Sequence, residues 1–341
     1  MNLPNALTTF RALAMVPFVW VLFMDFPHKD LVVLAAFLAL ALTDWLDGHL
    51  ARKRNQVTDF GKILDPIADK ALTLVLFFYL TTLGIPLWMP LVMATREIVM
   101  TVMRIAALPY DMVIPASGLG KIKTVSQMLA IPAVLLAVPH AAELVGIAVL
   151  VSVISGIDYY LSMSKRIPEI SNLPNTVTMV RFLLLPVGIW AMLSEQMDMA
   201  VLTIGLIFLG DKVDGSLAKH LRLETPFGRV FDNITDYIVL AGIAVAALFS
   251  QLIGLYVLLP LLVPLGGLIF AKARHFRMSD IPYPVLIVGK LGIVYGYVVV
   301  IAILIDFSYK DMMYWAGVAV AYLISLWYVV HGLLSKHSTM R

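Results

Sequence analysis

The 341-residue chain contains no cysteine, and only 14% of its residues are charged. The lack of cysteine excludes disulfide bonds and metal sites built from thiolates. The low charge excludes an ordinary soluble domain, in which about a quarter of the residues are charged. Because 61% of the residues are hydrophobic and the mean hydropathy is +0.91, the sequence predicts an integral membrane protein.

Other familiar signatures are also missing. The seven histidines show no metal-ligand spacing, and there is no glycine-rich phosphate loop of the Walker type. The first ten residues lack the basic segment and cleavage site of a signal peptide, so the first apolar stretch is expected to stay in the protein. We expect membrane lipids as partners and no nucleic acid.

Apolar stretches long enough to cross a bilayer recur along the whole chain. Six lie between residues 6 and 161 and six between residues 176 and 334, which predicts about twelve helical spans. With a cytoplasmic N-terminus, only Lys29 and Lys310 of the 25 basic residues fall at outer ends. Since cytoplasmic loops carry the excess of Lys and Arg, the sequence predicts a multi-pass protein of the cytoplasmic (inner) membrane with this orientation.

The chain contains two copies of one sequence repeat. The pattern Asn-Leu-Pro-Asn-x2-Thr-x2-Arg begins at Asn2 and again at Asn172. Each copy holds an even number of predicted spans, so both enter the membrane from the same side and form parallel repeats. We therefore expect an all-α fold with two six-helix repeats, residues 1–163 and 172–341, joined by a linker at 164–171. The repeats would pair as a pseudo-dimer within one chain.

Aspartates carry the sharpest signal. Both copies have two aspartates three residues apart near the inner end of the second span and two more, four residues apart, at the start of the third. Residues three and four apart share one helix face, so two such helices would bring four carboxylates together. The first set is Asp44, Asp47, Asp65 and Asp69, and the second is Asp211, Asp214, Asp232 and Asp236.

Four carboxylates at a membrane boundary repel one another unless a cation holds them. Oxygen ligands favour Mg²⁺ or Mn²⁺ over zinc. A single aspartate at a span end can equally be a solvated interfacial residue, but eight fixed positions, seven of which match in both copies, argue for a site.

This pattern resembles the signature of the CDP-alcohol phosphatidyltransferase family, D-x2-D-G-x2-A-R-x8-G-x3-D-x3-D, which the first copy matches at every fixed position. The resemblance implies that each set of four aspartates binds two metal ions, which grip the pyrophosphate of a CDP-lipid. It makes Asp69 the general base, with Asp236 as its second-copy equivalent. It also implies a cytidine nucleotide site lined by Gly48, Arg52 and Gly61, which correspond to Gly215, Lys219 and Gly228.

Basic residues of the first copy point to the acceptor, because a phosphorylated alcohol needs Arg or Lys donors. The segments Arg-Glu-Ile and Gly-Lys-x-Lys-Thr-x-x-Gln-Met are similar to the bacterial phosphatidylglycerophosphate synthase branch of the family. That resemblance implies transfer from CDP-diacylglycerol to sn-glycerol 3-phosphate. The residues expected to bind the acceptor phosphate are first Arg104, Lys121 and Lys123, and next Arg96. These residues would otherwise anchor span ends to anionic headgroups.

The second copy departs from the family pattern. Lys219 replaces the motif arginine, Tyr237 stands in the place of Lys70, and Gly292 in that of Lys123. Gly266 and Gly267 replace Arg96 and Glu97. Three roles stay open for this half: a site for another alcohol, a weakened duplicate, or a structural partner.

Rival interpretations differ in chemistry or in class. The same transfer could use inositol phosphate, serine, or phosphatidylglycerol, the last of which gives cardiolipin. A transporter also combines many spans with parallel halves, but it would place ionisable residues near mid-membrane rather than at one face. A lipid-binding scaffold would bind metal without turnover.

Overall fold

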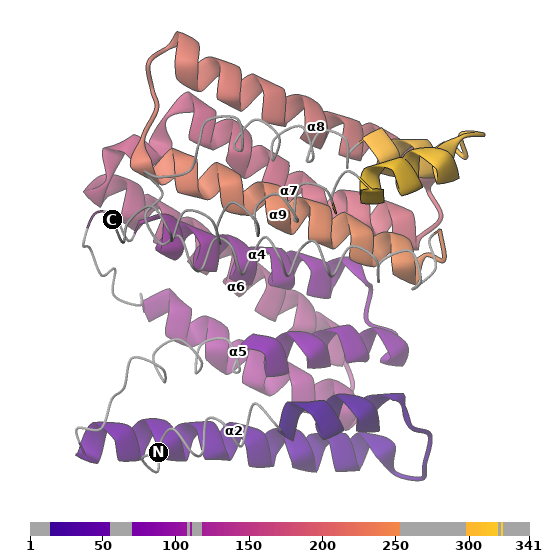
Figure 1. Cartoon of the computed structure of the whole chain (residues 1–341). Helices are drawn as coiled ribbons and strands as arrows, with labels where there is room; N and C mark the ends of the chain where they lie inside the picture. Colours follow the sequence, from indigo (N-terminus) through magenta and orange to yellow (C-terminus); the bar gives the residue numbers. More distant parts are fainter. Residues whose placement is uncertain are drawn as a thin grey trace, which may run out of the picture. The chain divides into compact units, whose positions relative to one another are not determined.

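The computed structural model describes residues 14–54, 70–107, 110, 118–252, 298–319 and 322, with side chains left out for 44–54. Within these ranges every regular element is helical. The chain divides into two compact units, residues 1–101 with 111–167, and residues 102–110 with 168–341. Figure 1 shows the helices of each unit.

The described residues of the first unit form four long helices and two shorter helical segments. The shorter ones are Ala14–Phe23 and Lys70–Leu83, the latter ending in the 3-10 turn η1 (Leu80–Leu83). The long helices are α2 (Lys29–Arg54), α4 (Trp88–Ala106), α5 (Gly118–Leu135) and α6 (Ala141–Arg166). Their core is aliphatic and aromatic, with Phe37, Leu76 and Phe77 completely buried.

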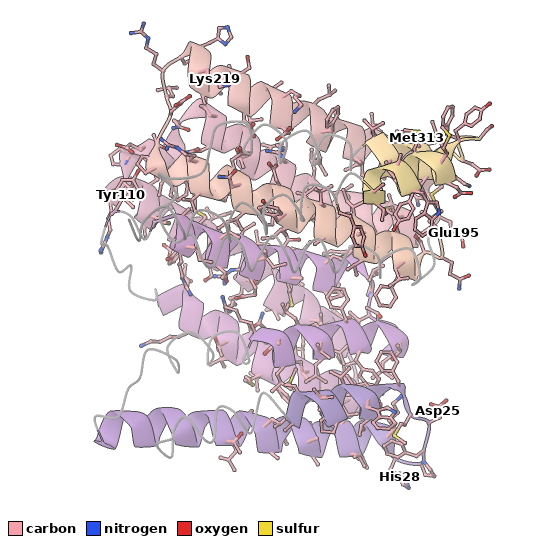
Figure 2. All side chains as sticks on the ribbon, in the orientation of Figure 1. Asp25, His28, Tyr110, Glu195, Lys219 and Met313 are labelled. Carbon is pink, nitrogen blue, oxygen red and sulfur yellow. The ribbon has the colours of Figure 1, made fainter. Side chains whose placement is uncertain are left out.

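The second unit is built around three packed helices (Figure 1). They are α7 (Leu173–Leu193), α8 (Met197–His220) and α9 (Pro226–Phe249). Helical segments at 298–304 and 310–319 follow. Leu304 joins Ile204, Ile207 and Val239 in the core of this unit. In Figure 2, Lys219 marks one end of α8, and Glu195 lies near the other.

Capping residues explain where α7 and α9 begin. Asn172 lies before α7, and its side-chain oxygen accepts a hydrogen bond from the backbone N–H of Asn175 (2.9 Å). Thr225 does the same for α9 through the N–H of Gly228 (2.9 Å). A proline occupies the first turn of each helix, where its missing N–H costs nothing. The Asn-Leu-Pro-Asn repeat is thus the start signal of a helix in the second half.

Long helices of both units bury polar residues and expose apolar ones. On α6, Ser152, Ser155 and Gly156 are buried. Between its charged ends the same helix exposes aliphatic side chains, which include Ile147, Leu150, Ile154, Ile157 and Leu161. On α7, Arg181 is 1% exposed, whereas Leu183 is 55% exposed. This pattern fits a lipid environment, because in water the apolar stripe would face inward.

Among the described residues, three helices are both long and apolar enough to cross a membrane, namely α6, α7 and α9. The structure therefore supports an all-helical membrane protein, while about twelve spans and a six-helix repeat remain predictions. The expected linker at 164–171 contains the end of α6 at Arg166 and the 3-10 turn η3 (Pro168–Ser171). The expected domain boundaries likewise remain a prediction.

Candidate functional site

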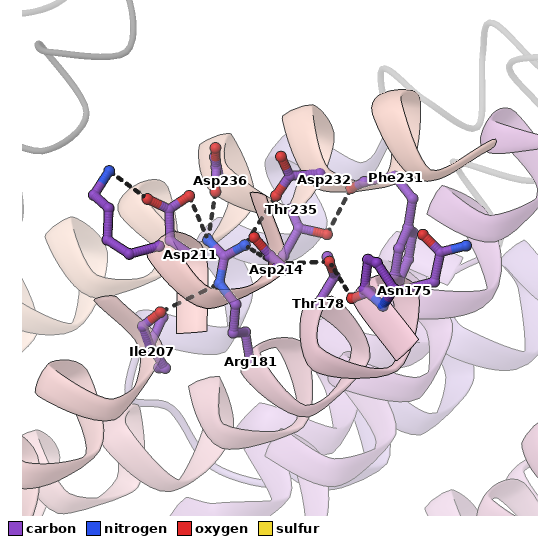
Figure 3. Close-up of polar contacts among 12 residues, drawn as sticks. Asn175, Thr178, Arg181, Ile207, Asp211, Asp214, Phe231, Asp232, Thr235 and Asp236 are labelled. Carbon is purple, nitrogen blue, oxygen red and sulfur yellow. Dashed lines mark hydrogen bonds and ion pairs between the residues drawn. The ribbon is translucent and has the colours of Figure 1, made fainter. Parts of the chain in front are cut away.

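Four carboxylates of the second half converge on one guanidinium group (Figure 3). Asp211 and Asp214 lie in the last three turns of α8, and Asp232 and Asp236 lie in the first three turns of α9. Since α8 and α9 are consecutive antiparallel helices, both pairs occur near the same end of the unit. The spacing of the aspartates therefore does bring them together in this half.

Arg181 of α7 lies at the centre of this aspartate cluster. Its Nη1 atom is 2.8 Å from Oδ2 of Asp214 and 2.9 Å from Oδ1 of Asp232. Its Nη2 atom is 2.5 Å from Oδ1 of Asp236 and 3.4 Å from Oδ1 of Asp211. The side chain of Arg181 is 1% exposed, whereas those of its partners range from 4% exposed for Asp214 to 30% for Asp232. One guanidinium group therefore contacts every aspartate of the second motif.

Other residues hold Arg181 and the aspartates in position. The Nε–H group of Arg181 donates to the carbonyl of Ile207 (3.2 Å), which fixes the plane of the guanidinium group. Thr178, one turn earlier on α7, donates its hydroxyl to Oδ2 of Asp214 (2.9 Å). A Cβ atom at Gly210 would lie 2.6 Å from Cγ of Arg181, so glycine is required here for the arginine to pass.

Charge in the cluster is only partly balanced. Four carboxylates and one guanidinium group leave a formal charge of −3, since four negative charges meet one positive charge. Lys212 adds a more exposed ion pair with Asp211 (3.0 Å). Within the described part of the chain, Oδ1 of Asp214 is buried without a hydrogen-bond partner, a costly state for a carboxylate oxygen. The cluster thus keeps a net negative charge that additional positive charge would stabilise.

The chemistry of these donors suits a hard divalent cation. One oxygen from each of Asp211, Asp214 and Asp232 can be chosen so that all three lie within 4.8 Å of one another. An oxygen-only set fits Mg²⁺ or Mn²⁺. However, Arg181 already engages all four carboxylates, so a metal ion would compete with the guanidinium group. As arranged, the second site fits a cation supplied by the chain better than a pair of metal ions.

Residues expected at the second nucleotide site are placed as follows. Gly215 faces open space, because a Cβ atom there would meet nothing within 4 Å. Lys219 is exposed near the end of α8 (Figure 2). Gly228 is tightly packed instead: its Cβ atom would lie 2.5 Å from Oδ1 of Asn175. Glycine at 228 therefore lets the start of α7 approach α9.

First-copy motif residues fall mostly outside the described part of the chain. Helix α2 includes Asp44, Asp47, Gly48 and Arg52 in its backbone, but their side chains are among those left out. Gly61, Asp65 and Asp69 lie outside the described residues altogether. Their predicted roles stay predictions.

Two of the four predicted acceptor-phosphate residues come together in the first unit. Arg96 and Lys123 both contact the carboxylate of Glu97, at 2.8 and 2.5 Å. Nζ of Lys70 lies 3.8 Å from the same carboxylate. Arg104 and Lys121 are exposed on α4 and α5. The structure thus describes a basic cluster of Lys70, Arg96 and Lys123 around Glu97.

Sequence reasoning missed the residues that organise both clusters. It treated the Asn-x2-Thr-x2-Arg pattern as a mark of duplication, although Asn175, Thr178 and Arg181 are spaced three apart and share one face of α7. That spacing, together with an arginine inside an apolar stretch, was the available signal. Glu97 was noted beside Arg96 without a role.

Comparison with known proteins adds a family and named relatives. The sequence profile described as CDP-alcohol phosphatidyltransferase matches residues 1–157 and again residues 171–323. A CDP-diacylglycerol--glycerol-3-phosphate 3-phosphatidyltransferase of Bacillus subtilis is 34% identical over 47% of this chain and 93% of its own length. A probable phosphatidylglycerophosphate synthase of Mycobacterium tuberculosis is 38% identical over 52% of this chain and 87% of its own length. These relatives match the first half.

Proposed function

The chain belongs to the CDP-alcohol phosphatidyltransferase family and is a transferase, and from this premise we propose its substrates and the division of labour between its halves. The first half transfers the phosphatidyl group of CDP-diacylglycerol to sn-glycerol 3-phosphate, giving phosphatidylglycerophosphate and CMP for phospholipid synthesis. The main support is the match of this half to relatives named for that reaction over about nine-tenths of their length.

Asp44, Asp47, Asp65 and Asp69 hold two Mg²⁺ or Mn²⁺ ions in the active half. When bound, such ions neutralise phosphate charge and stabilise the leaving group. The identical spacing in the second half, where the four carboxylates converge, supports this assignment of the first set.

The reaction is a displacement at the phosphorus atom of the phosphatidyl group. The acceptor hydroxyl forms a new P–O bond as the P–O bond to CMP breaks. The carboxylate of Asp69 takes the hydroxyl proton as general base. Gly48, Arg52 and Gly61 bind the cytidine nucleotide and hold the leaving CMP.

The acceptor phosphate binds to basic residues of α4 and α5. Arg96 and Lys123 are the principal ligands, since they occur in one cluster and have the charge that a phosphate monoester requires. Arg104 and Lys121, which are exposed, contribute from farther out. This ordering differs from the sequence-based choice, which put Arg104, Lys121 and Lys123 first and Arg96 next.

The second half supports the first without catalysing the reaction. Arg181 pairs with all four of its aspartates, and Tyr237, Gly266 and Gly292 replace three cations of the first half. Residues 172–341 would then act as a permanent second subunit of residues 1–163 in a pseudo-dimer. Both halves present their aspartates at the cytoplasmic face of the inner membrane.

Release of CMP tests this proposal directly. Purified full-length protein is incubated with CDP-diacylglycerol and Mg²⁺ or Mn²⁺, and each of glycerol 3-phosphate, inositol phosphate, serine and phosphatidylglycerol is supplied in turn. We expect metal-dependent CMP release with glycerol 3-phosphate. Release only with another alcohol would replace the acceptor, and activity unchanged by a chelator would contradict the metal assignment. If none of the four alcohols gives CMP release, the transporter or scaffold interpretation would be favoured.

A further inference from the structure

A single buried carboxylate holds three cations in the first unit. The residue Glu97 is 5% exposed, and its carboxylate contacts Nζ of Lys123 at 2.5 Å, Nη1 of Arg96 at 2.8 Å and Nζ of Lys70 at 3.8 Å. Three positive charges and one negative charge leave a formal surplus of +2. A phosphate monoester carries close to two negative charges near neutral pH, so the surplus matches its charge.

The cations are more accessible than the carboxylate that holds them. Side-chain exposure is 25% for Lys70, 12% for Arg96 and 13% for Lys123, against 6% for Glu97. The cations therefore offer more surface to an approaching anion than the carboxylate does. The charge of Glu97 balances part of their mutual repulsion.

Arg96 and Lys70 each make further contacts besides those with Glu97. Arg96 donates from Nε to the carbonyl of Ser152 (3.2 Å) and from Nη2 to the hydroxyl of Ser155 (2.9 Å), both on α6. A Cβ atom at Gly156 would lie 3.2 Å from Cγ of Arg96, so the absence of a side chain lets the arginine lie close to α6.

Lys70 is linked to Glu97 a second time through Thr101. Nζ of Lys70 donates to the hydroxyl of Thr101 (2.6 Å), and that hydroxyl donates to the backbone carbonyl of Glu97 (2.8 Å). Lys70 directly follows Asp69, the proposed general base.

The second half has none of the residues of this basic cluster at the corresponding positions. In the repeat, Tyr237 replaces Lys70, and Gly292 replaces Lys123. Gly266 and Gly267 replace Arg96 and Glu97, so the acid is lost together with the three cations. The joint absence of the acid and the three cations indicates that the acid acts together with these cations.

We propose that Glu97 is a positioning residue that preorganises Lys123, Arg96 and Lys70 to receive the phosphate of the acceptor alcohol. This inference rests on the proposed function and deepens it, because it explains how the first half distinguishes a phosphorylated alcohol from a neutral one. Preorganisation reduces the cost of ordering long side chains when the ligand binds.

Substitution of Glu97 by Gln separates positioning from simple charge. Loss of the carboxylate adds net positive charge, which by itself would tighten phosphate binding, whereas loss of positioning weakens it. We expect weaker binding: the KM for glycerol 3-phosphate rises about tenfold, which corresponds to about 1.4 kcal/mol, and the KM for CDP-diacylglycerol changes less than about twofold. Glu97→Asp, which keeps the charge, recovers part of the loss. Glu143→Gln removes an equal charge at the exposed start of α6 and is the control.

A double-mutant cycle then tests whether Glu97 acts through Lys123. In a Lys123→Met background the effect of Glu97→Gln on the same KM should shrink, because the lysine it positions is gone. Fully additive effects, an unchanged KM, or tighter binding of glycerol 3-phosphate in Glu97→Gln would each overturn the inference.

A binding measurement keeps this test distinct from the test of the reaction. Glycerol 3-phosphate should raise the thermal unfolding midpoint of the wild-type protein, and Glu97→Gln should lose most of that shift. If wild-type protein releases no CMP but shows this difference, the proposed reaction fails and the phosphate site stands. If it releases CMP and the two proteins shift equally, only the role of Glu97 fails. No shift in either protein, without CMP release, contradicts both.

Discussion

The two halves of the chain bury charge in opposite ways. In the second half one cation, Arg181, is surrounded by four carboxylates. In the first half one carboxylate, Glu97, is surrounded by three cations. An acid-rich cluster attracts cations, whereas a cation-rich cluster attracts anions, so the transfer we propose, from a CDP-lipid to a phosphorylated alcohol, needs both. Only the first half has the residues for both clusters.

A small difference beside the motif suggests why the halves diverge. Gly210 precedes Asp211, and its counterpart before Asp44 is Thr43. Gly210 leaves room for the stem of Arg181. A threonine Cβ in that place would exclude an arginine in the same conformation.

Among the substitutions in the two clusters, removal of Arg181 should have the largest effect on stability. Arg181→Met leaves four clustered carboxylates without their central cation, and we expect a loss of about 3–5 kcal/mol in the free energy of unfolding. Thermal unfolding in detergent measures this loss, with Arg222→Met, an exposed arginine of the same unit, as the control.

Metal ions should then compensate for the missing guanidinium group. Addition of Mn²⁺ is expected to raise the unfolding midpoint of Arg181→Met more than that of the wild type. Equal stability of Arg181→Met and the wild type would show that the four ion pairs contribute nothing.

The basic cluster gives the next largest effect. Lys123→Met removes a cation that contacts Glu97, and we expect kcat/KM for glycerol 3-phosphate to fall about a hundredfold, or about 2.7 kcal/mol. Lys121→Met, two residues earlier and exposed, should cost clearly less. Steady-state kinetics distinguish the two lysines, with Lys165→Met at the exposed end of α6 as a neutral comparison. A larger effect at Lys121 would show that the phosphate binds elsewhere.

Substitution of Gly210 tests whether the stability of the second half depends on the space that this glycine leaves for the Arg181 side chain. Gly210→Ala places a methyl group 2.6 Å from Cγ and 2.9 Å from Cδ of Arg181, so we expect a loss of about 1–3 kcal/mol in unfolding free energy. Gly205→Ala is the matched control, since its methyl group would meet nothing within 4 Å. If both variants are equally stable, the arginine has another way past position 210.

Alkaline pH produces the smallest predicted effect. Desolvation by burial, helped by a hydrogen bond to Glu169 (2.6 Å), raises the pKa of Tyr110 above its usual value near 10. Since the neutral phenol is favoured in the folded state, its contribution is complete below that value and is lost as pH rises through the higher folded pKa. Tyr110→Phe should therefore show a slightly smaller fall in unfolding midpoint between about pH 9 and 11. An identical fall in both proteins would exclude this contribution.

Local sequence patterns predicted the helices that carry the aspartates, but they did not predict which side chains from distant parts of the chain contact one another. The helix that contains Asp211 and Asp214 and the one that contains Asp232 and Asp236 were predicted from apolar stretches and spacing, and so was the meeting of their carboxylates. Arg181 could not be placed among them, because sequence spacing sets the face of α7 but not its rotation against α8 and α9. The pairing of Lys123 with Glu97 likewise depends on how α5 packs, which no periodicity specifies.

The central claim is that the first half catalyses the transfer and the second half supports it. The most direct measurement compares CMP release by Asp69→Asn and Asp236→Asn, two equivalent substitutions in the two halves of the full-length protein, at equal amounts of folded protein. We predict that Asp69→Asn lowers the rate by about 10³-fold, whereas Asp236→Asn retains most of the wild-type rate. Loss of activity in Asp236→Asn with activity preserved in Asp69→Asn would contradict the account and assign the chemistry to the second half.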